Sequence, residues 1–260
     1  MAQQGGAGGE GSPAEEPSIG VVIPALNEEV DLPHTLSAVK QQEPGAQDVL
    51  VVDGGSVDRT AEVARTGGAR VLAAQRGRAR QMNAGAEACG GDVLLFLHAD
   101  TQLPAGALQA VRAALADGSV LGGCFQLRFD VQHESLALQF WSFCTRCWLF
   151  RTPRLVFGDR GIFLRRSAFQ ALGGYREWPI VEDVDLAMRL SALGGRGSFA
   201  FLPLAVTTSA RRFLETGVVR QQLLNGFILL CWYLGFSPDT MKRWYKYTVP
   251  QPAAKDAKRD

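Results

Sequence analysis

Hydrophobic and polar positions alternate along the first 120 residues in a way that predicts strands followed by helices. Apolar residues dominate four or five consecutive positions in four segments, which are predicted to be strands: 19–23, 49–52, 70–73 and 93–97. The segments between and after them are predicted to be helices: 30–42, 60–66, 79–88 and 105–116. In the first of these, Leu32, Leu36 and Val39 fall on one helical face. This order is typical of an α/β fold in which a mostly parallel central sheet lies between two helical layers.

The pattern changes after residue 120. Residues 122–129 alternate like an antiparallel strand, 136–150 form a Trp- and Phe-rich segment predicted to be a helix, and 161–165 are predicted to be a further strand. We interpret these elements as an elaboration of the same domain, because 260 residues suffice for one large α/β domain with an appended piece.

Four segments are expected along the chain. The main domain is predicted to span 18–214, and a helical C-terminal extension 215–250. Residues 1–17 are rich in Gly, Ala, Glu and Gln and contain no apolar segment typical of a signal peptide or membrane anchor, so we expect a disordered leader. Residues 251–260 are expected to be a polar tail.

The cysteine pattern favours a reducing compartment, and we expect a cytoplasmic protein. The chain has five cysteines, an odd number, and its size does not require disulfides for stability. Cys144 and Cys147 have CxxC spacing, but no second Cys/His pair follows at zinc-site spacing. Buried thiols are therefore the preferred interpretation.

The charge distribution argues against nucleic acid as a partner. The formal net charge is +1, with 47% hydrophobic and 20% charged residues, and no concentrated basic stripe marks a nucleic-acid surface. Positive charge gathers only locally, in Arg76-Gly-Arg78-Ala-Arg80 and in Arg211-Arg212. Such small clusters suit the phosphate groups of a small ligand.

Polar residues follow several of the predicted strands. Asn27 and Glu28 follow the first strand, Asp53 the second, and Asp100 the strand at 93–97. Ligands of open α/β sheets bind at the carboxyl ends of the strands, so these side chains are expected to share one site. Three acids, Glu182, Asp183 and Asp185, stand within four positions before an apolar helix-like run, and clustered acids of this kind are typical of catalysis, metal binding or a helix cap.

Six motifs in this order resemble those of family 2 glycosyltransferases with the GT-A fold. They are Pro24-Ala-Leu-Asn-Glu28, Asp53-Gly-Gly-Ser-Val-Asp58, Gly77-Arg-Ala-Arg-Gln-Met-Asn83, His98-Ala-Asp100, Gly158-Asp-Arg-Gly161 and Glu182-Asp183. The resemblance spans about residues 18–214 and is greatest to small, single-domain bacterial-type members. It implies a UDP- or GDP-sugar donor, Mg²⁺ or Mn²⁺, and inverting transfer to a hydroxyl acceptor that the sequence does not identify.

Donor binding is assigned to residues of the first three motifs. Asp53, before the flexible Gly54-Gly55, can accept hydrogen bonds from a base or ribose, and the Pro24 motif with Glu28 can close the other side. A turn-forming role for Asp53 and a helix N-terminal role for Glu28 remain open. Arg78, Arg80 and Asn83 lie where a helix begins, near a potential phosphate site, although a solvated basic turn is also compatible with the sequence.

Asp100 is assigned as the metal ligand. It matches the last acid of the family's DxD-type motif, which binds Mg²⁺ or Mn²⁺ bridging the diphosphate. His98 replaces the first acid, so the chain offers fewer hard oxygen ligands than its family pattern. His98 is either a ligand or a hydrogen-bonded core histidine.

The catalytic base is assigned to Asp183 by resemblance to the family's ED motif, with Glu182 orienting it or the acceptor. Asp185 is expected to pair with Arg189 at i,i+4 spacing. Asp159 and Arg160 are expected to line the acceptor pocket, with a tight turn as the alternative. Arg212 lies where processive relatives carry a QxxRW motif. The motif is incomplete here, which disfavours processive polymer synthesis. Two roles remain for Arg212: a contact to phosphate, or a basic residue at the start of a helix.

Membrane contact and two other function classes complete the expectations. The apolar block within 227–236 is too short to span a bilayer. With the Trp, Tyr, Lys and Arg residues after it, this segment is expected to contact membranes peripherally, and a helix buried against the domain is the alternative. A catalytically weak nucleotide-sugar-binding or scaffold protein also fits the altered metal motif. A sugar-nucleotidyl transferase is disfavoured, because Pro24-Ala-Leu-Asn27 replaces the glycine-rich loop of that class.

Overall fold

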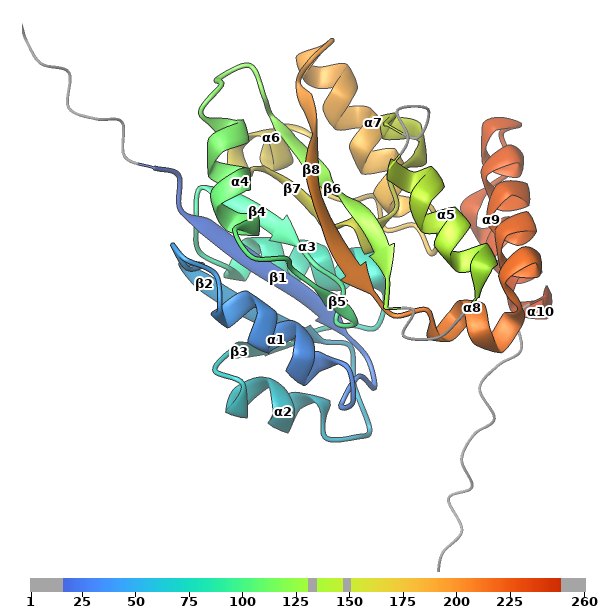
Figure 1. The fold of residues 1–260 in the computed structure, drawn as a ribbon, viewed down its shortest axis with the longest axis horizontal. Coiled ribbons are helices and arrows are strands. Elements are labelled where there is room, and N and C mark those ends of the chain that lie inside the picture. The colour runs from blue at the N-terminus through green and yellow to red at the C-terminus, as the bar shows by residue number, and fades with distance from the viewer. Residues whose placement is uncertain (1–15, 131–134, 147–150, 249–260) are drawn as a thin grey trace, which may run out of the picture.

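The computed structural model describes residues 16–130, 135–146 and 151–248 and contains one eight-stranded sheet (Figure 1). The strands lie in the order β3-β2-β1-β4-β7-β6-β8-β5. Their bounds are β1 Ile19–Ala25, β2 Asp48–Asp53, β3 Arg70–Ala73, β4 Val93–Phe96, β5 Thr101–Gln102, β6 Gly122–Phe129, β7 Ile162–Arg165 and β8 Phe199–Thr208.

Helices cover both faces of this sheet. Their bounds are α1 Leu32–Lys40, α2 Thr60–Thr66, α3 Arg78–Ala88, α4 Ala107–Leu115, α5 Leu136–Arg146, α6 Arg166–Ala171, α7 Glu182–Gly194, α8 Arg211–Thr216, α9 Val218–Tyr233 and α10 Pro238–Thr248, with 3₁₀ turns η2 Pro153–Leu155 and η3 Gly158–Arg160. Alternate residues of β1 face opposite layers: Val21 packs with α1 and α4, and Val22 packs with α3, α6 and α7. The predicted three-layer α/β architecture is therefore confirmed.

The sheet is parallel in one half and mixed in the other. Strands β3, β2, β1 and β4 are parallel, with Val21 opposite Val49 and Leu95. β7 then runs antiparallel to both β4 and β6, whereas β6 and β8 are parallel and β5 is antiparallel to β8. The antiparallel prediction for 122–129 holds toward β7 and fails toward β8, because β8, which the sequence analysis did not predict, adds along the other edge of β6.

The C-terminal helices extend the domain beyond one end of the sheet, where α5, α8, α9 and α10 lie together (Figure 1). A small core joins α9 and α10 to the residue preceding α7: Val181, Ile228, Cys231 and Met241 are buried together. This confirms the predicted helical extension. Cys89, Cys124 and Cys231 are buried thiols, whereas Cys147 of the CxxC pair lies outside the described residues, as do the tail and nearly all of the leader.

Candidate active site

The loops after β1 and β2 interlock through hydrogen bonds. The backbone N–H of Asn27 donates to Ser56 Oγ (2.9 Å), and Asn27 Oδ1 accepts from the N–H of Val57 (2.9 Å). Asn27 has a φ of 56°, a left-handed conformation that Asn tolerates better than most residues. The N–H of Glu28 donates to Thr60 Oγ1 (2.8 Å). These contacts fix the two strand ends against each other before any ligand binds.

Asp53 belongs to this loop framework. Its carboxylate accepts hydrogen bonds from the N–H and hydroxyl of Ser56, so the turn-forming role is observed. The carboxylate can accept further hydrogen bonds beyond these, so the structure is compatible with a nucleotide contact, which stays a prediction. Pro24, the next-to-last residue of β1, lies opposite Val52 of β2 in the same frame.

Gln81 is a structural residue that the sequence analysis did not assign. Its side chain is buried, and Nε2 donates both to the carbonyl of Ala25 (2.9 Å) and to that of Val52 (2.8 Å). The amide therefore ties the first turn of α3 to the ends of β1 and β2. Its position within the motif Gly77 to Asn83 is the sequence signal that could have identified this role.

The first residues of α3 reach toward α7, more than 90 residues later in the chain. Arg78 Nη1 lies 3.6 Å from Glu182 Oε1 and 3.5 Å from Asp183 Oδ2. Arg80 instead pairs with exposed Glu177, with Nε 2.9 Å from Oε2. Arg78 is thus the arginine of this motif that contacts the predicted catalytic acids.

Asn83 has a structural role in the protein. Its amide donates to the carbonyl of Tyr175 and accepts from the N–H of the same residue, both at 2.9 Å. The side chain thereby fastens the turn before α7 to α3. Both polar atoms of Asn83 have protein partners, which weakens the sequence-based assignment of this residue to the donor.

The acids at the start of α7 are buried in different environments. Burial raises the pKa of Asp183 to about 7, and the charge of Glu182 adds to the shift while Arg78 opposes it. Asp183 Oδ2 accepts a hydrogen bond from the N–H of Gly158 (3.0 Å), and its Oδ1 has no hydrogen-bond partner among the described residues. Asp183 therefore meets the requirement of a general base whose pKa lies near neutrality.

Asp185 is held by two arginines. Its carboxylate lies 2.7 Å from Arg189 Nε, the predicted i,i+4 pair, and 3.0 Å from Arg176 Nη1. A buried carboxylate paired twice is a structural anchor of α7. This confirms the predicted Asp185–Arg189 ion pair.

Gly158 brings His98 and Asp183 together. A Cβ at position 158 would lie under 3.0 Å from both Asp183 Oδ2 and His98 Nε2, so only glycine allows both side chains to converge there. Burial and the charge of Arg78 hold the pKa of His98 well below its usual range, so the ring is neutral. Its Nε2 is buried without a hydrogen-bond partner within the described part of the chain. Of the two roles predicted for His98, a fully hydrogen-bonded core histidine does not match this geometry.

Asp100 and Asp159 bring further acidic groups to the centre. Burial raises the pKa of Asp100, and nearby Arg211 and Arg212 oppose that shift. Burial also raises the pKa of Asp159 to about 6, and its Oδ1 has no hydrogen-bond partner in the described ranges. Within those ranges no group of three or more His, Cys, Asp or Glu residues is arranged to hold a metal ion. Mg²⁺ usually takes only one or two protein carboxylates and fills its shell with water and substrate phosphates, so a site built on Asp100 is compatible with such an ion.

The two arginines at the start of α8 differ in their contacts. Arg211 lies 3.0 Å from Asp31 Oδ2 and 3.4 Å from Glu28 Oε2, and so links α8 to the loop after β1. Burial and the charge of Asp100 raise the pKa of Glu28 to about 7. Arg212 is exposed, and its charge acts on His98, Asp100 and Asp159.

Arg160 supports the tight-turn alternative. Its side chain is buried, Nε donates to the carbonyl of Phe125 (3.0 Å), and the guanidinium lies 5.7 Å from the ring centre of Phe201. These contacts hold η3 on β6 and β8, and Gly161 completes the turn with a φ of 61°. The contacts of Arg160 thus stabilise the turn that carries Asp159.

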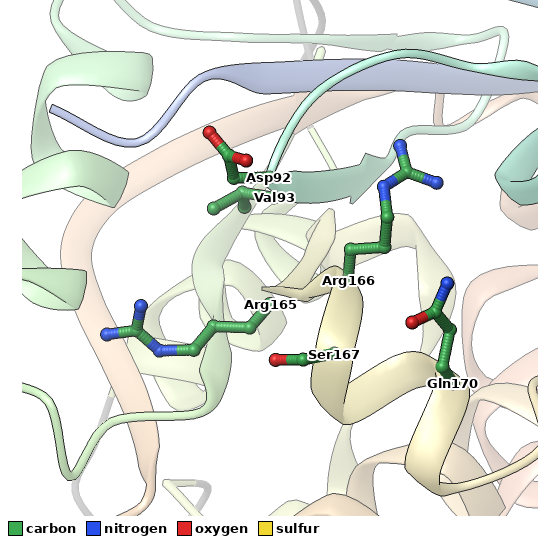
Figure 2. Close-up of a pocket in the computed structure, with 6 residues that line it drawn as sticks. All are labelled: Asp92, Val93, Arg165, Arg166, Ser167 and Gln170. Carbon is green, nitrogen blue, oxygen red and sulfur yellow. The ribbon is translucent and has the colours of Figure 1, made fainter. Parts of the chain in front are cut away.

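A cavity of about 330 Å³ lies at the opposite end of β4 from Asp100 (Figure 2). Its lining consists of Asp92, Val93, Arg165, Arg166, Ser167 and Gln170. The guanidinium of Arg166 donates to the carbonyls of Ala86, Cys89 and Gly91, and that of Arg165 donates to the carbonyls of Leu115 and Val120. Both arginines serve the fold there, so this cavity is separate from the candidate site.

Comparison with known proteins identifies the family. The model of glycosyl transferase family 2 matches residues 20–173, more than half of the chain, and the chain belongs to this family. An uncharacterized glycosyltransferase of Mycobacterium tuberculosis is 37% identical over 105 residues, which are 40% of this chain and 46% of the relative. A probable glycosyltransferase of Bacillus subtilis is 27% identical over 217 residues, 74% of this chain and 50% of the relative. The chain thus spans about half the length of these curated relatives.

Solved structures share the fold. A mannosyltransferase from Pyrobaculum calidifontis in complex with GDP-Man and Mn²⁺ matches with a TM-score of 0.66 and 18% identity, over 88% of this chain and 68% of that one. Glucosyl-3-phosphoglycerate synthase from M. tuberculosis, in complex with Mn²⁺, UDP and glucosyl-3-phosphoglycerate, matches with a TM-score of 0.59 and 18% identity, over 83% and 79%. The predicted GT-A glycosyltransferase fold is confirmed.

Proposed function

We propose that this chain transfers a sugar from a nucleotide-diphosphate sugar to a hydroxyl acceptor with inversion at the anomeric carbon. The observation that carries the proposal is the buried Asp183, whose pKa lies at about 7 and whose Oδ1 has no partner among the described residues. Such a carboxylate can accept the proton of an acceptor hydroxyl close to neutral pH.

The transfer is a single displacement. The acceptor oxygen attacks the anomeric carbon as its proton passes to Asp183, and the bond from that carbon to the diphosphate breaks on the opposite face. The nucleoside diphosphate leaves with the bonding electron pair. Glu182 orients Asp183 or the acceptor, and Arg78, within 3.6 Å of both acids, steadies the pair.

A divalent ion supplies charge neutralisation for the diphosphate when it is bound. Asp100 would hold Mg²⁺ or Mn²⁺ there. Arg78, Arg211 and Arg212 add positive charge near Asp100, since each interacts electrostatically with it. The complexes of the two structural relatives with Mn²⁺ and GDP-Man or UDP support this part of the proposal.

The nucleotide lies on the interlocked loops after β1 and β2. Asp53, Glu28 and the Pro24 strand end would contact the base and ribose there. Asp159 and Arg212 line the acceptor side, whereas Arg160 and Asn83 keep the structural roles that their hydrogen bonds give them.

Calorimetry tests the proposal directly. UDP, GDP and their sugars are titrated with and without Mn²⁺, and binding is expected for one nucleotide in the presence of the ion. Asp100→Asn should weaken that binding about tenfold or more, or 1.4 kcal/mol and upwards. Equal affinity of wild type and variant would remove Asp100 from the site. Metal-dependent binding without donor hydrolysis or transfer would favour a binding or scaffold protein instead.

A further inference from the structure

The outer face of α9 exposes a continuous apolar stripe. Its residues are Val219, Leu223, Phe227 and Leu230, continued by Leu234 just after the helix, and each is between 48% and 70% exposed. They recur every three or four positions, so they lie on one helical face about 22 Å long. The opposite face of the helix is already used, because Ile228 and Cys231 pack in the small core with Val181 and Met241.

A second apolar stripe lies on the neighbouring helix α5, which contacts α9 and runs beside it (Figure 1). Leu136, Phe140 and Phe143 follow one another at i, i+4 and i+7, and are 80%, 66% and 58% exposed. The inner face of α5 is anchored by Leu138, which is buried in the main core. We call the two stripes together the α5–α9 face.

The α5–α9 face is larger than the isolated apolar residues that most protein surfaces carry. Scattered exposed apolar side chains need no explanation, whereas exposed apolar stripes on two helices that contact each other indicate an interaction site. The side chains of both stripes are about half exposed or more. None of the helices in the described part of the chain is long and apolar enough to cross a bilayer.

The charge around this face favours an anionic partner. Residues 211–248 contain six Lys or Arg and two Asp or Glu, a net charge of +4, whereas the whole chain carries +1. A second copy of the chain would bring two such positive segments together. A bilayer with anionic headgroups attracts them and also accepts the apolar stripes.

Aromatic residues of α9, of α10 and of the turn between them lie together. The Trp244 ring lies 5.5 Å from that of Phe236 and 6.2 Å from that of Phe227, and Tyr233 is half exposed. Trp and Tyr are enriched at the boundary between the headgroups and acyl chains of a bilayer, because one end of each ring system is apolar and the other polar.

We propose that the α5–α9 face docks on anionic lipid bilayers without spanning them. The inference is independent of the transfer reaction. It also extends the expected region of membrane contact beyond 227–236: Ile228, Leu229 and Cys231 of that segment are buried, the exposed stripe starts at Val219, and α5 adds a second stripe.

Flotation with phosphatidylcholine vesicles, with and without phosphatidylglycerol, tests the proposal at low and high salt. Wild type should float with the anionic vesicles at low salt. The double variant Leu223→Gln, Leu230→Gln should partition at least about tenfold less, because two exposed side chains that would enter the acyl boundary become polar. The matched control is Val30→Gln, Leu193→Gln, which changes exposed apolar residues away from this face and should float like wild type.

Three outcomes would overturn the inference. Folded wild type that stays at the bottom shows that the face does not bind lipid. Equal flotation of wild type and the Leu223 and Leu230 variant places binding elsewhere. A wild-type dimer that this variant dissociates, with no flotation, makes the face an interface between copies. Donor calorimetry on the same preparations keeps these results apart from the proposed function, because a failure of docking leaves nucleotide binding unchanged.

Discussion

The loops after β1 and β2 differ from the centre of the site in how their polar groups are satisfied. In the loops, Asn27 and Asp53 both find partners in the segment 56–57. At the centre, polar atoms of His98, Asp159 and Asp183 are buried without hydrogen-bond partners among the described residues. The loops belong to the ends of β1 and β2, whereas the centre combines the end of β4 with η3 and the start of α7.

This contrast separates a frame from a reaction centre. Buried polar groups are normally hydrogen-bonded, and leaving one without a partner costs about 1–3 kcal/mol. The loops avoid that cost and hold a fixed shape. The centre retains unpartnered oxygen and nitrogen atoms where an acceptor hydroxyl or a cation would supply the missing contacts. Substitutions should therefore affect chemistry at the centre and stability in the loops.

The largest effect is expected for Asp183→Asn. Loss of the base should lower the transfer rate ~10²–10⁴-fold, because the amide cannot take up the acceptor proton. Donor affinity should stay near wild type. The rate is measured with saturating donor and the affinity by calorimetry.

Asp185→Asn is the comparison for this variant. Asp185 pairs with Arg176 and Arg189, so replacing its carboxylate by an amide should lower the thermal midpoint of unfolding. The protein that remains folded should retain transfer activity. Full turnover in Asp183→Asn together with loss in Asp185→Asn would show that the base has been misassigned.

Gly158→Ala should be the next most damaging change. The added methyl group would collide with Asp183 Oδ2 and His98 Nε2, and crowding of this kind costs typically about 1–3 kcal/mol. The expected result is a lower free energy of unfolding in urea and a reduced transfer rate. Gly118→Ala is the matched control, since a Cβ there meets nothing within 4 Å. Unchanged transfer in Gly158→Ala would mean that the convergence of His98 and Asp183 does not matter for catalysis.

The pH dependence should follow Asp183. Its carboxyl must be ionised to act, and its pKa lies at about 7, so kcat/KM should fall about tenfold per pH unit well below that value. Stability should respond in the opposite sense: a carboxyl whose pKa is raised on folding stabilises the protein below its unfolded pKa, and that contribution is lost as the pH rises through about 7. Asp183→Asn should therefore gain in thermal midpoint relative to wild type between pH 4 and pH 7. A constant difference across this range would contradict the raised pKa.

Ser56→Ala should have the smallest effect. It removes the hydroxyl that donates to Asp53 and accepts from the N–H of Asn27, which should cost about 1 kcal/mol of stability. Transfer should stay within a few-fold of wild type, because the loop serves as a frame. A loss of transfer comparable to that of Asp183→Asn would erase the contrast between loops and centre.

The sequence alone predicted the elements of the first half well. Thr60–Thr66 and Arg70–Ala73 match their predicted bounds, and the neighbouring elements differ by a few residues. Local periodicity suffices there, because β1, β2 and β4 are buried on both faces and each helix packs one apolar stripe. Family resemblance also supplied the identities of the residues that meet at the centre.

Only the tertiary structure decided which of these residues touch. Arg78 meets Glu182 and Asp183 because α3 and the start of α7 pack on the same face of the sheet, across about 100 residues of sequence. The side-chain amides of Asn83 and Gln81 form hydrogen bonds with backbone carbonyls, and the spacing of residues in the sequence does not reveal these contacts. The same holds for β8, whose pairing with β6 makes the sheet mixed, and for α9, whose two apolar faces look alike in sequence although one is core and the other exposed. Periodicity records which side of an element is apolar, whereas the partner of that side is set by long-range packing.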